Sequence, residues 1–318
     1  MASRRFIKIR GALFIFILLA KANSVMAAFV TGAGYTSTEL YSTTGTYTTI
    51  GGLDLDGGKL YFGQYTDMKS LNLGDNSTQV VGTIPSNVGN ALVIRHNGTT
   101  YTSYGTSYNS PYPYKMGYIN GSGSYVNQLN EDGIYDCAVN SLGDCYIVAN
   151  PDALGSKILK YNWSSGSTTE VADVGGYSGG IAFDHFDNLY YAEQTSGQIL
   201  KFTTAQVATG GLDISEAEAI LSITAGYICF GADDDLYATT GWGATLAKYD
   251  LSTQSLVSEI AYGGIGKFIV DGDDIYFVDT DWVDYSSTIQ HVVPEPSTVL
   301  LLGLGGLLLR RRKSINGL

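Results

Sequence analysis

Aromatic side chains occur in three polar segments of the sequence, and in one of them they stand next to carboxylates. Residues 101–114 are rich in tyrosine, a second segment contains Trp242, and residues 279–285 combine aspartates with Trp282 and Tyr285. Aromatic rings can stack on the C–H faces of sugar rings, and carboxylates accept hydrogen bonds from sugar hydroxyls. We therefore predict a face that binds saccharide or another polymer, the alternative being aromatics that pack over the rim of the fold. The candidate residues are Tyr104, Tyr108, Tyr112, Trp242, Trp282 and Tyr285.

A second group of acidic residues lies in short turns, namely Asp184 with Asp187 and Asn188, Asp233 to Asp235, and Asp271 with Asp273 and Asp274. Such oxygen ligands suit calcium, but no D-x-D-x-D-G loop with a closing glutamate occurs. Asp and Asn also bond their own backbone in turns and tolerate left-handed conformations. Because these turns recur along the chain, we favour turn chemistry over calcium and predict no metal site and no cofactor.

Little in the sequence indicates catalysis. Of the three histidines, His96 and His185 lie in equivalent turns and His291 lies near the C-terminal segment. No nucleophile elbow, H-E-x-x-H motif or phosphate-binding loop is present. We therefore predict no catalytic residue, although the many paired acids keep a hydrolase or lyase open as the alternative.

Six copies of one local pattern organise the chain between these segments. An apolar run is followed by an Asp/Asn/Gly turn and then by a tyrosine, with successive tyrosines 40, 45, 44, 47 and 39 residues apart. Each copy contains four strand signals, which in the third are 134–139, 145–149, 157–161 and 168–174. Four strands repeated at this period predict an all-β propeller of six blades, with a seven-bladed ring or an open array as alternatives. The six tyrosines are Tyr61, Tyr101, Tyr146, Tyr190, Tyr237 and Tyr276.

The repeats resemble the NHL-like propeller group, in which turns of the form D-x-x-x-N-L-Y recur, as they do from Asp184 to Tyr190. The order of strand signals also predicts how the ring closes. Two N-terminal strands, 38–44 and 46–50, are expected to become outer strands of the last blade, whose own third strand at 288–292 is weak. The main helical candidate is a loop segment, Asp213 to Leu221.

The C-terminal segment has a different composition. Val293 precedes Pro294-Glu295-Pro296, an apolar run follows over 299–309, and a basic block ends the segment with Arg310, Arg311, Arg312 and Lys313. This order resembles the PEP-CTERM sorting signal of exported bacterial proteins. The resemblance implies recognition by an exosortase-type enzyme at Pro294, Glu295 and Pro296, in bacteria that often make exopolysaccharide. Eleven apolar residues form about 16 Å of helix, a marginal span of the membrane, with the basic block on the cytoplasmic side.

The N-terminus agrees with export. Arg4, Arg5, Lys8 and Arg10 precede an apolar core, and Val25-Met26-Ala27 offers a cleavage site, so residues 1–27 are predicted to be a signal peptide, with a retained anchor as the alternative. Residues 28–309 contain nine basic and thirty acidic residues, a net charge of −21 that disfavours nucleic acid as a partner. Cys137, Cys145 and Cys229 do not form a disulfide framework, although a bridge between the first two is conceivable.

Together these features predict a propeller over residues 28–291 and a sorting and anchor segment over 292–318. We expect an exported cell-surface or extracellular-matrix protein of a Gram-negative-type bacterium, held in the inner membrane through its C-terminal helix during transit. Its expected role is non-enzymatic binding of exopolysaccharide or a surface protein. A lyase or hydrolase that acts on an extracellular polymer and a spacer without any ligand are the alternatives.

Overall fold

The computed structural model describes residues 29–43, 48–85, 92–105, 114–129, 133–150 and 155–295. The predicted signal peptide, the apolar run and the basic block of the C-terminal segment lie outside these residues. In the described ranges no helix is both long enough and apolar enough to cross a membrane.

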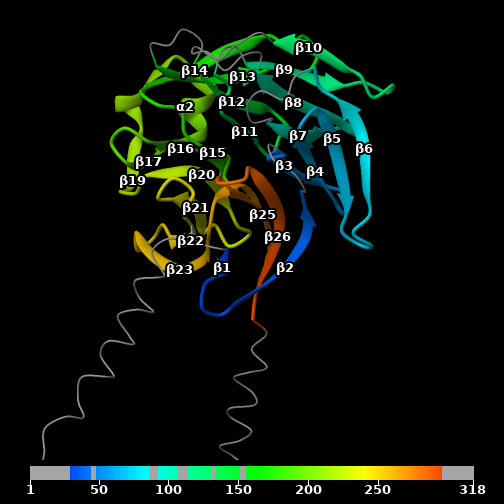
Figure 1. Ribbon diagram of the computed structural model, residues 1–318. Coiled ribbons are helices and arrows are strands. Elements are labelled where there is room, and N and C mark those ends of the chain that lie inside the picture. The colour runs from blue at the N-terminus through cyan, green and yellow to red at the C-terminus, as the bar shows by residue number, and fades with distance from the viewer. Residues whose placement is uncertain are drawn as a thin grey trace, which may run out of the picture.

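Six sheets form a ring around a central channel (Figure 1), and their strand pairs are antiparallel except for one short parallel pair, between residues 172–173 and 212–213. Blade one contains β3 (Ile50–Asp56), β4 (Lys59–Gln64), β5 (Asp67–Asn72) and β6 (Thr78–Thr83). Blade two contains β7 (Val93–His96), β8 (Thr99–Gly105), β9 (Tyr114–Ile119) and β10 (Tyr125–Leu129). Blade three contains β11 (Asp136–Val139), β12 (Cys145–Ala149), β13 (Ser156–Tyr161) and β14 (Thr168–Gly175).

The second half of the ring repeats this plan. Blade four contains β15 (Ile181–Phe183), β16 (Leu189–Glu193), β17 (Gln198–Phe202) and β19 (Glu218–Leu221). Blade five contains β20 (Ala225–Phe230), β21 (Leu236–Thr240), β22 (Thr245–Asp250) and β23 (Ser255–Tyr262). Blade six contains β24 (Ile265–Asp271), β25 (Asp274–Asp281), β26 (Ser286–Pro294) and the N-terminal β2 (Tyr35–Ser42). The predicted all-β, six-bladed propeller is confirmed.

The repeated tyrosines explain how neighbouring blades adhere. Six hydrophobic clusters of described residues each join two adjacent blades. Every repeated tyrosine lies on the second strand of its blade, is at most 9% exposed, and packs in the cluster shared with the following blade. In three blades the residue opposite it on the third strand is a lysine whose ammonium lies 5.4–5.8 Å from the ring centroid, as Lys248 does over Tyr237. The repeat therefore encodes blade-to-blade packing rather than a ligand site.

The ring closes differently from the prediction in one respect. β2 is the outer strand of blade six and pairs with β26, so donation of an N-terminal strand is confirmed. The second predicted donor strand is wrong, because Ile50 begins β3, the inner strand of blade one. A shorter strand, β1 (Val30–Thr31), instead extends blade five by pairing with β23. β26 is also longer than expected, and it continues to Pro294.

The predicted helix from Asp213 to Leu221 is wrong. This segment contains β18 (Leu212–Asp213), the short 3-10 helix η2 (Ile214–Glu216) and β19. Asp213 caps η2 together with Glu216, after which the chain extends and pairs with β17 as an outer strand. The α-helix of this loop, α2 (Thr204–Thr209), begins earlier at the capping residue Thr203.

Candidate functional site

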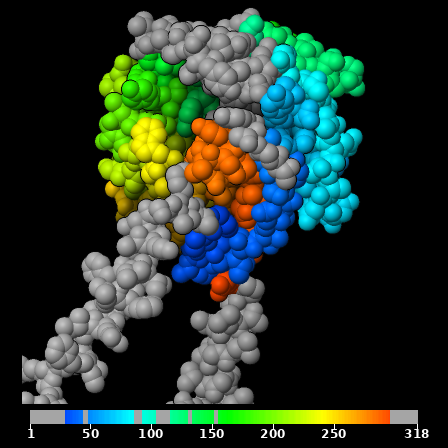
Figure 2. Space-filling view, in the orientation of Figure 1, coloured from blue at the N-terminus to red at the C-terminus, as the bar shows by residue number. Residues whose placement is uncertain are grey.

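A hollow of about 310 Å³ opens at the mouth of the central channel. It is formed by the beginnings of the inner strands β3, β20 and β24 and by turns that join second to third strands in blades four, five and six. In Figure 2 the yellow loop of blade five and the orange loop of blade six project on either side of it. Side chains on its wall include Ile50, Tyr135, Gln194, Thr224, Tyr227, Thr239, Trp242, Lys267, Thr280 and Trp282.

Trp242 comes from the turn between β21 and β22. Its side chain is 89% exposed, and its backbone φ of 60° lies in the left-handed region, between two glycines that also have positive φ. Gly243 holds this turn against blade six, because its carbonyl accepts the N–H of Ile265 at 2.7 Å. A Cβ on Gly243 would lie only 2.4 Å from the carbonyl oxygen of Ile265. The turn is thus anchored to the neighbouring blade and presents the indole to solvent.

Trp282 comes from the equivalent turn of blade six and is 53% exposed. Its ring meets that of Tyr285 edge to face, with centroids 6.4 Å apart. Its indole nitrogen lies near Gly264, where an added Cβ would be 3.3 Å away. The turn itself is fixed by the carboxylate of Asp281, which accepts the N–H of Val283 at 2.7 Å.

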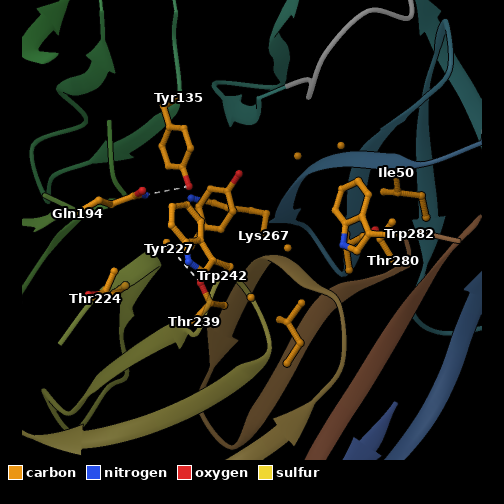
Figure 3. A pocket seen from close by; sticks show the side chains of 18 residues that line it. Ile50, Tyr135, Gln194, Thr224, Tyr227, Thr239, Trp242, Lys267, Thr280 and Trp282 are labelled. Atoms are coloured by element: carbon orange, nitrogen blue, oxygen red, sulfur yellow. Dashed lines mark hydrogen bonds between the residues drawn. The ribbon is translucent and has the colours of Figure 1, made fainter. Parts of the chain in front are cut away.

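Opposite Trp282, polar and aromatic groups gather on the other side of the hollow (Figure 3). The rings of Tyr135 and Tyr227 are stacked, with centroids 5.3 Å apart and an interplanar angle of 14°. The Gln194 amide donates to the Tyr135 hydroxyl at 3.5 Å, and the Tyr227 N–H donates to the Thr239 hydroxyl at 2.9 Å. The Lys267 ammonium lies 5.3 Å from the centre of the Tyr227 ring.

Beneath these rings Lys267 forms an ion pair with Asp136. Asp136 is completely buried, and its second carboxylate oxygen accepts the N–H of Ile181 at 3.1 Å. Burial by itself would lower the pKa of Lys267, but the attraction of Asp136 outweighs it and the pKa is raised. The side chain of Lys267 is therefore a protonated ammonium at neutral pH and not a free amine. Its charge is balanced by the carboxylate of Asp136.

Asp54, on the inner strand of blade one, is the other carboxylate that interacts with Lys267. It accepts the backbone N–H of Arg95 at 2.5 Å and that of Leu55 at 2.9 Å. Burial raises the pKa of Asp54 to about 6, although these two hydrogen bonds and the charge of Lys267 oppose the shift. Desolvation is therefore the dominant effect at this position.

The acidic turns lie on the other face of the ring, and most of their carboxylates bond to other groups of the protein. Asp184 accepts hydrogen bonds from the N–H groups of Phe186 and Asn188 within its own turn. Asp187 accepts two hydrogen bonds from Ser141 of the preceding blade. Lys248 pairs with both Asp233 and Asp235, and in the described residues no three His, Cys, Asp or Glu side chains are grouped so as to hold one ion.

The structure brings together two of the six candidate ligand residues. Trp242 and Trp282 both line the hollow, and Tyr285 contacts Trp282 from beside it. Tyr104 lies on β8 in blade two, whereas Tyr108 and Tyr112 lie outside the described residues. Tyr101, which opens the same tyrosine-rich segment, is buried in the cluster between blades two and three. Cys137 and Cys145 are buried in that cluster as free thiols.

Sequence reasoning missed Tyr135, Tyr227, Gln194 and the pair of Lys267 with Asp136. These residues belong to four blades and meet only because the ring brings the channel ends of those blades together. One signal was visible in the sequence, since Lys267 interrupts the apolar run of the inner strand of blade six before its terminal Asp271. A lysine in such a strand would place its charge inside the fold, which is costly unless a group of opposite charge lies beside it.

The sorting segment leaves from the face opposite the hollow. β26 begins at the turn that carries Trp282 and runs to Pro294, which lies near the turn between β24 and β25. Val293 and Pro294 are part of this strand, opposite Thr36 and Tyr35 of β2, and the Glu295 N–H donates to the Gly34 carbonyl at 2.8 Å. Pro296 and Arg310, Arg311 and Arg312 lie outside the described residues.

Comparisons with known proteins agree with the predicted sorting motif and with the propeller fold. Residues 292–313 match the family model described as the PEP-CTERM protein-sorting motif. No curated protein matches the chain. Solved structures with the same fold include a gluconolactonase from Xanthomonas campestris, with 11% identity, a TM-score of 0.63 and coverage of 83% of this chain and 91% of that one.

Two further solved propellers are similar at comparable levels. Virginiamycin B lyase from Staphylococcus aureus has 16% identity, a TM-score of 0.53 and coverage of 84% of this chain and 99% of that one. The calcium-binding protein regucalcin from Agrobacterium tumefaciens has 12% identity, a TM-score of 0.57 and coverage of 83% and 96%. At these identities the similarity establishes the fold alone.

The sorting motif and the ring together define the chain. A PEP-CTERM motif implies export and passage through a membrane-anchored state, and such motifs are recognised by exosortase-type sorting enzymes. The chain is therefore an exported protein that carries a PEP-CTERM sorting motif behind a six-bladed propeller similar to gluconolactonase and NHL-type propellers.

Proposed function

We propose that this protein is a non-enzymatic binding protein of the cell surface or extracellular matrix, and that it holds saccharide units of an exopolysaccharide at the mouth of its channel. The observation that carries the proposal is that Trp242 and Trp282, from separate blades, border one hollow while remaining largely exposed. Contact of apolar indole surface with water is unfavourable. Two exposed indoles at one concave site therefore favour a ligand whose apolar faces can cover them.

The lining of the hollow supports a sugar. Its volume of about 310 Å³ is at the lower end of small-molecule sites, which suits one or two sugar rings rather than a folded partner. The hydroxyls of Tyr135 and Thr239 and the amide of Gln194 are neutral groups that can exchange hydrogen bonds with sugar hydroxyls. The net charge of −21 over residues 28–309 favours neutral or cationic saccharides over anionic ones.

The direction of β26 also supports this role. Because β26 leads from the hollow to the opposite face, an anchored tail would leave the hollow facing away from the membrane. Nine residues of strand span about 30 Å, so the site would stand well clear of the lipid surface. A polymer outside the membrane could then reach the hollow without passing the sorting segment.

The proposed function does not include the lactonase and lyase activities for which the similar structures are named. The two channel carboxylates do not suit the calcium that the name of regucalcin implies, since Asp136 is already bound to Lys267 and to the Ile181 N–H. Asp54 accepts two backbone N–H groups, and the ammonium of Lys267 repels a cation placed beside either acid. The donor set thus fits a structural ion pair better than a metal centre.

The proposal is tested by binding of the host's own exopolysaccharide to the purified full-length chain in mild detergent. We expect saturable binding that weakens about fivefold or more in Trp242→Ala and in Trp282→Ala, because loss of a stacking aromatic from a binding site costs about 1–3 kcal/mol. Phe186→Ala is the matched control, since Phe186 is also exposed but belongs to the turn between β15 and β16 on the opposite face. Absence of binding, or equal affinity in all variants, would refute the proposal.

A further inference from the structure

The fold and the sorting motif overlap in the chain. The matched motif begins at Val292, but β26 continues through Val292 and Val293 to Pro294. Two of the three residues of Pro294-Glu295-Pro296 therefore belong to the edge of the propeller, with no spacer between sheet and motif. Any enzyme that reads this tripeptide meets the body of blade six at the same place.

The backbone of this overlap is held on one side only. β25 pairs with β26 as far as Ile275 opposite Val292, whereas β2 continues beyond it to Tyr35 opposite Pro294. The hydrogen bond from the Glu295 N–H to the Gly34 carbonyl adds one residue more. The side chains of Pro294 and Glu295 are exposed, so the sheet engages their backbone while leaving their side chains outside.

Tyr35 ties this end of β2 to the rest of the ring. Its ring packs against the cluster between blades five and six, and its hydroxyl is 2.9 Å from that of Ser258 on β23. Tyr35 and Pro294 also border a second hollow, of about 200 Å³, together with Lys248, Asp233 and Asp273. The start of β2, and through it Pro294, is thus fixed to two blades.

We infer that the folded propeller keeps Pro294 and Glu295, two of the three residues of the tripeptide, from the sorting enzyme, and that this enzyme engages the conformer in which the end of β26 has separated from Gly34–Thr36. Enzymes and receptors that bind extended peptides use the peptide's main-chain N–H and C=O groups, and here β2 occupies one edge of that backbone. Separation involves only the terminal residues of a strand held on one side, and such local openings cost far less than global unfolding. The opening equilibrium therefore sets the rate of sorting.

The inference is tested in a host that has an enzyme of this class, by pulse-chase measurement of the conversion of the full-length chain to its processed form. Six residues, Gly-Ser-Gly-Ser-Gly-Ser, are inserted between Val292 and Val293 so that the motif lies beyond the reach of β2. We expect conversion to become about fivefold faster or more, which is the factor expected from the loss of one average backbone hydrogen bond. The same six residues inserted between Ser252 and Thr253, in an exposed turn of blade five, are the control and should leave the rate unchanged.

A point substitution separates the effect of pairing from that of spacer length. Tyr35→Ala loosens the start of β2 and should accelerate conversion, whereas Tyr41→Ala, near the other end of the same strand, should not. Hydrogen exchange of the Glu295 amide should rise in parallel in Tyr35→Ala but not in Tyr41→Ala. Equal conversion rates in the parent chain and in the chain with the insertion after Val292, including no conversion in either, would overturn the inference.

Discussion

The ammonium of Lys267 donates a hydrogen bond to the carboxylate of Asp136, 131 residues away in the sequence and on the opposite blade of the ring. The pair joins the inner strands β24 and β11 across the central channel. Lys267 also lines the hollow that Trp242 and Trp282 border. Lys267 therefore contributes both to the stability of the ring and to the wall of the candidate site.

Removal of one partner of this pair should be costly. Lys267→Met leaves Asp136 fully buried with the Ile181 N–H as its remaining donor, and an uncompensated buried charge costs about 3–5 kcal/mol. Because Lys267 itself is partly exposed, we expect a loss near the lower end of this range in urea unfolding. The double variant Lys267→Met/Asp136→Asn should recover most of the loss.

The control for this prediction is an ion pair at the surface. Lys160→Met removes the partner of Asp144, and both side chains of that pair are more than one third exposed. We expect a change of about 1 kcal/mol or less in the free energy of unfolding. If Lys267→Met were no more destabilising than Lys160→Met, the pair would not act as a tie between blades.

The raised pKa of Asp54 makes a prediction about pH. Its folded value of about 6 exceeds the unfolded value of 3.8, so the folded state holds the proton more tightly. The stabilisation that this proton gives is complete below about pH 3.8 and is lost as the pH rises through 6. Asp54→Asn removes the charge but keeps an acceptor for only one of the two N–H groups, because Leu55 and Arg95 donate to different oxygens of Asp54. The free energy of unfolding of the variant, relative to that of the parent chain, should therefore rise by about 1–3 kcal/mol from pH 4 to pH 7.5, whatever its offset at pH 4.

This prediction is checked by urea unfolding of both chains at several pH values. The difference between the two chains isolates Asp54 from other carboxylates, such as Asp233 and Asp250, whose pKa values hydrogen bonds hold below the ordinary value and whose effect on stability has the opposite sign. A difference that does not change with pH would mean that Asp54 is not desolvated in the folded ring.

Chelation should leave stability unchanged. Most carboxylates of the acidic turns and both channel acids already bond to groups of the protein, so we expect the same Tm with EDTA and with millimolar calcium. An ion bound at 100 times its Kd would instead add about 2.7 kcal/mol of stability and raise the Tm by several degrees. Such a rise in calorimetry would contradict the assignment of these acids to turn and ion-pair roles.

The repeated tyrosine shows why the fold could be predicted from the sequence. One packing solution is used at every blade interface, and it needs the same residue at the same place in each repeat, as Tyr146 and Tyr237 illustrate. Repetition of a local rule is visible without coordinates. The sorting segment was predictable for a similar reason, since its order of proline, apolar and basic residues is contiguous in the chain.

The errors of prediction occurred where one local pattern was compatible with two structures. Ile50 follows a polar, β-prone segment and could end a donor strand or begin an inner one, and contact with neighbouring blades decided for β3. The segment from Asp213 to Leu221 has helix-capping residues, yet pairing with β17 made its second half an outer strand. In both places tertiary pairing outweighed local preference.

By itself the sequence therefore determined the repeated four-strand unit, most of the strands within it and the presence of a sorting motif, because each depends on residues that are close in the chain. It favoured six blades, but the choice over a seven-bladed ring or an open array was decided by the strand pairing of the folded chain. Only the tertiary structure decided which loops share a hollow, that Lys267 reaches Asp136, and that Pro294 lies in a strand of the ring. These are contacts between blades or between the two ends of the chain. They follow from ring closure, which places residues far apart in sequence side by side and leaves no periodic signal of the pairs that it creates.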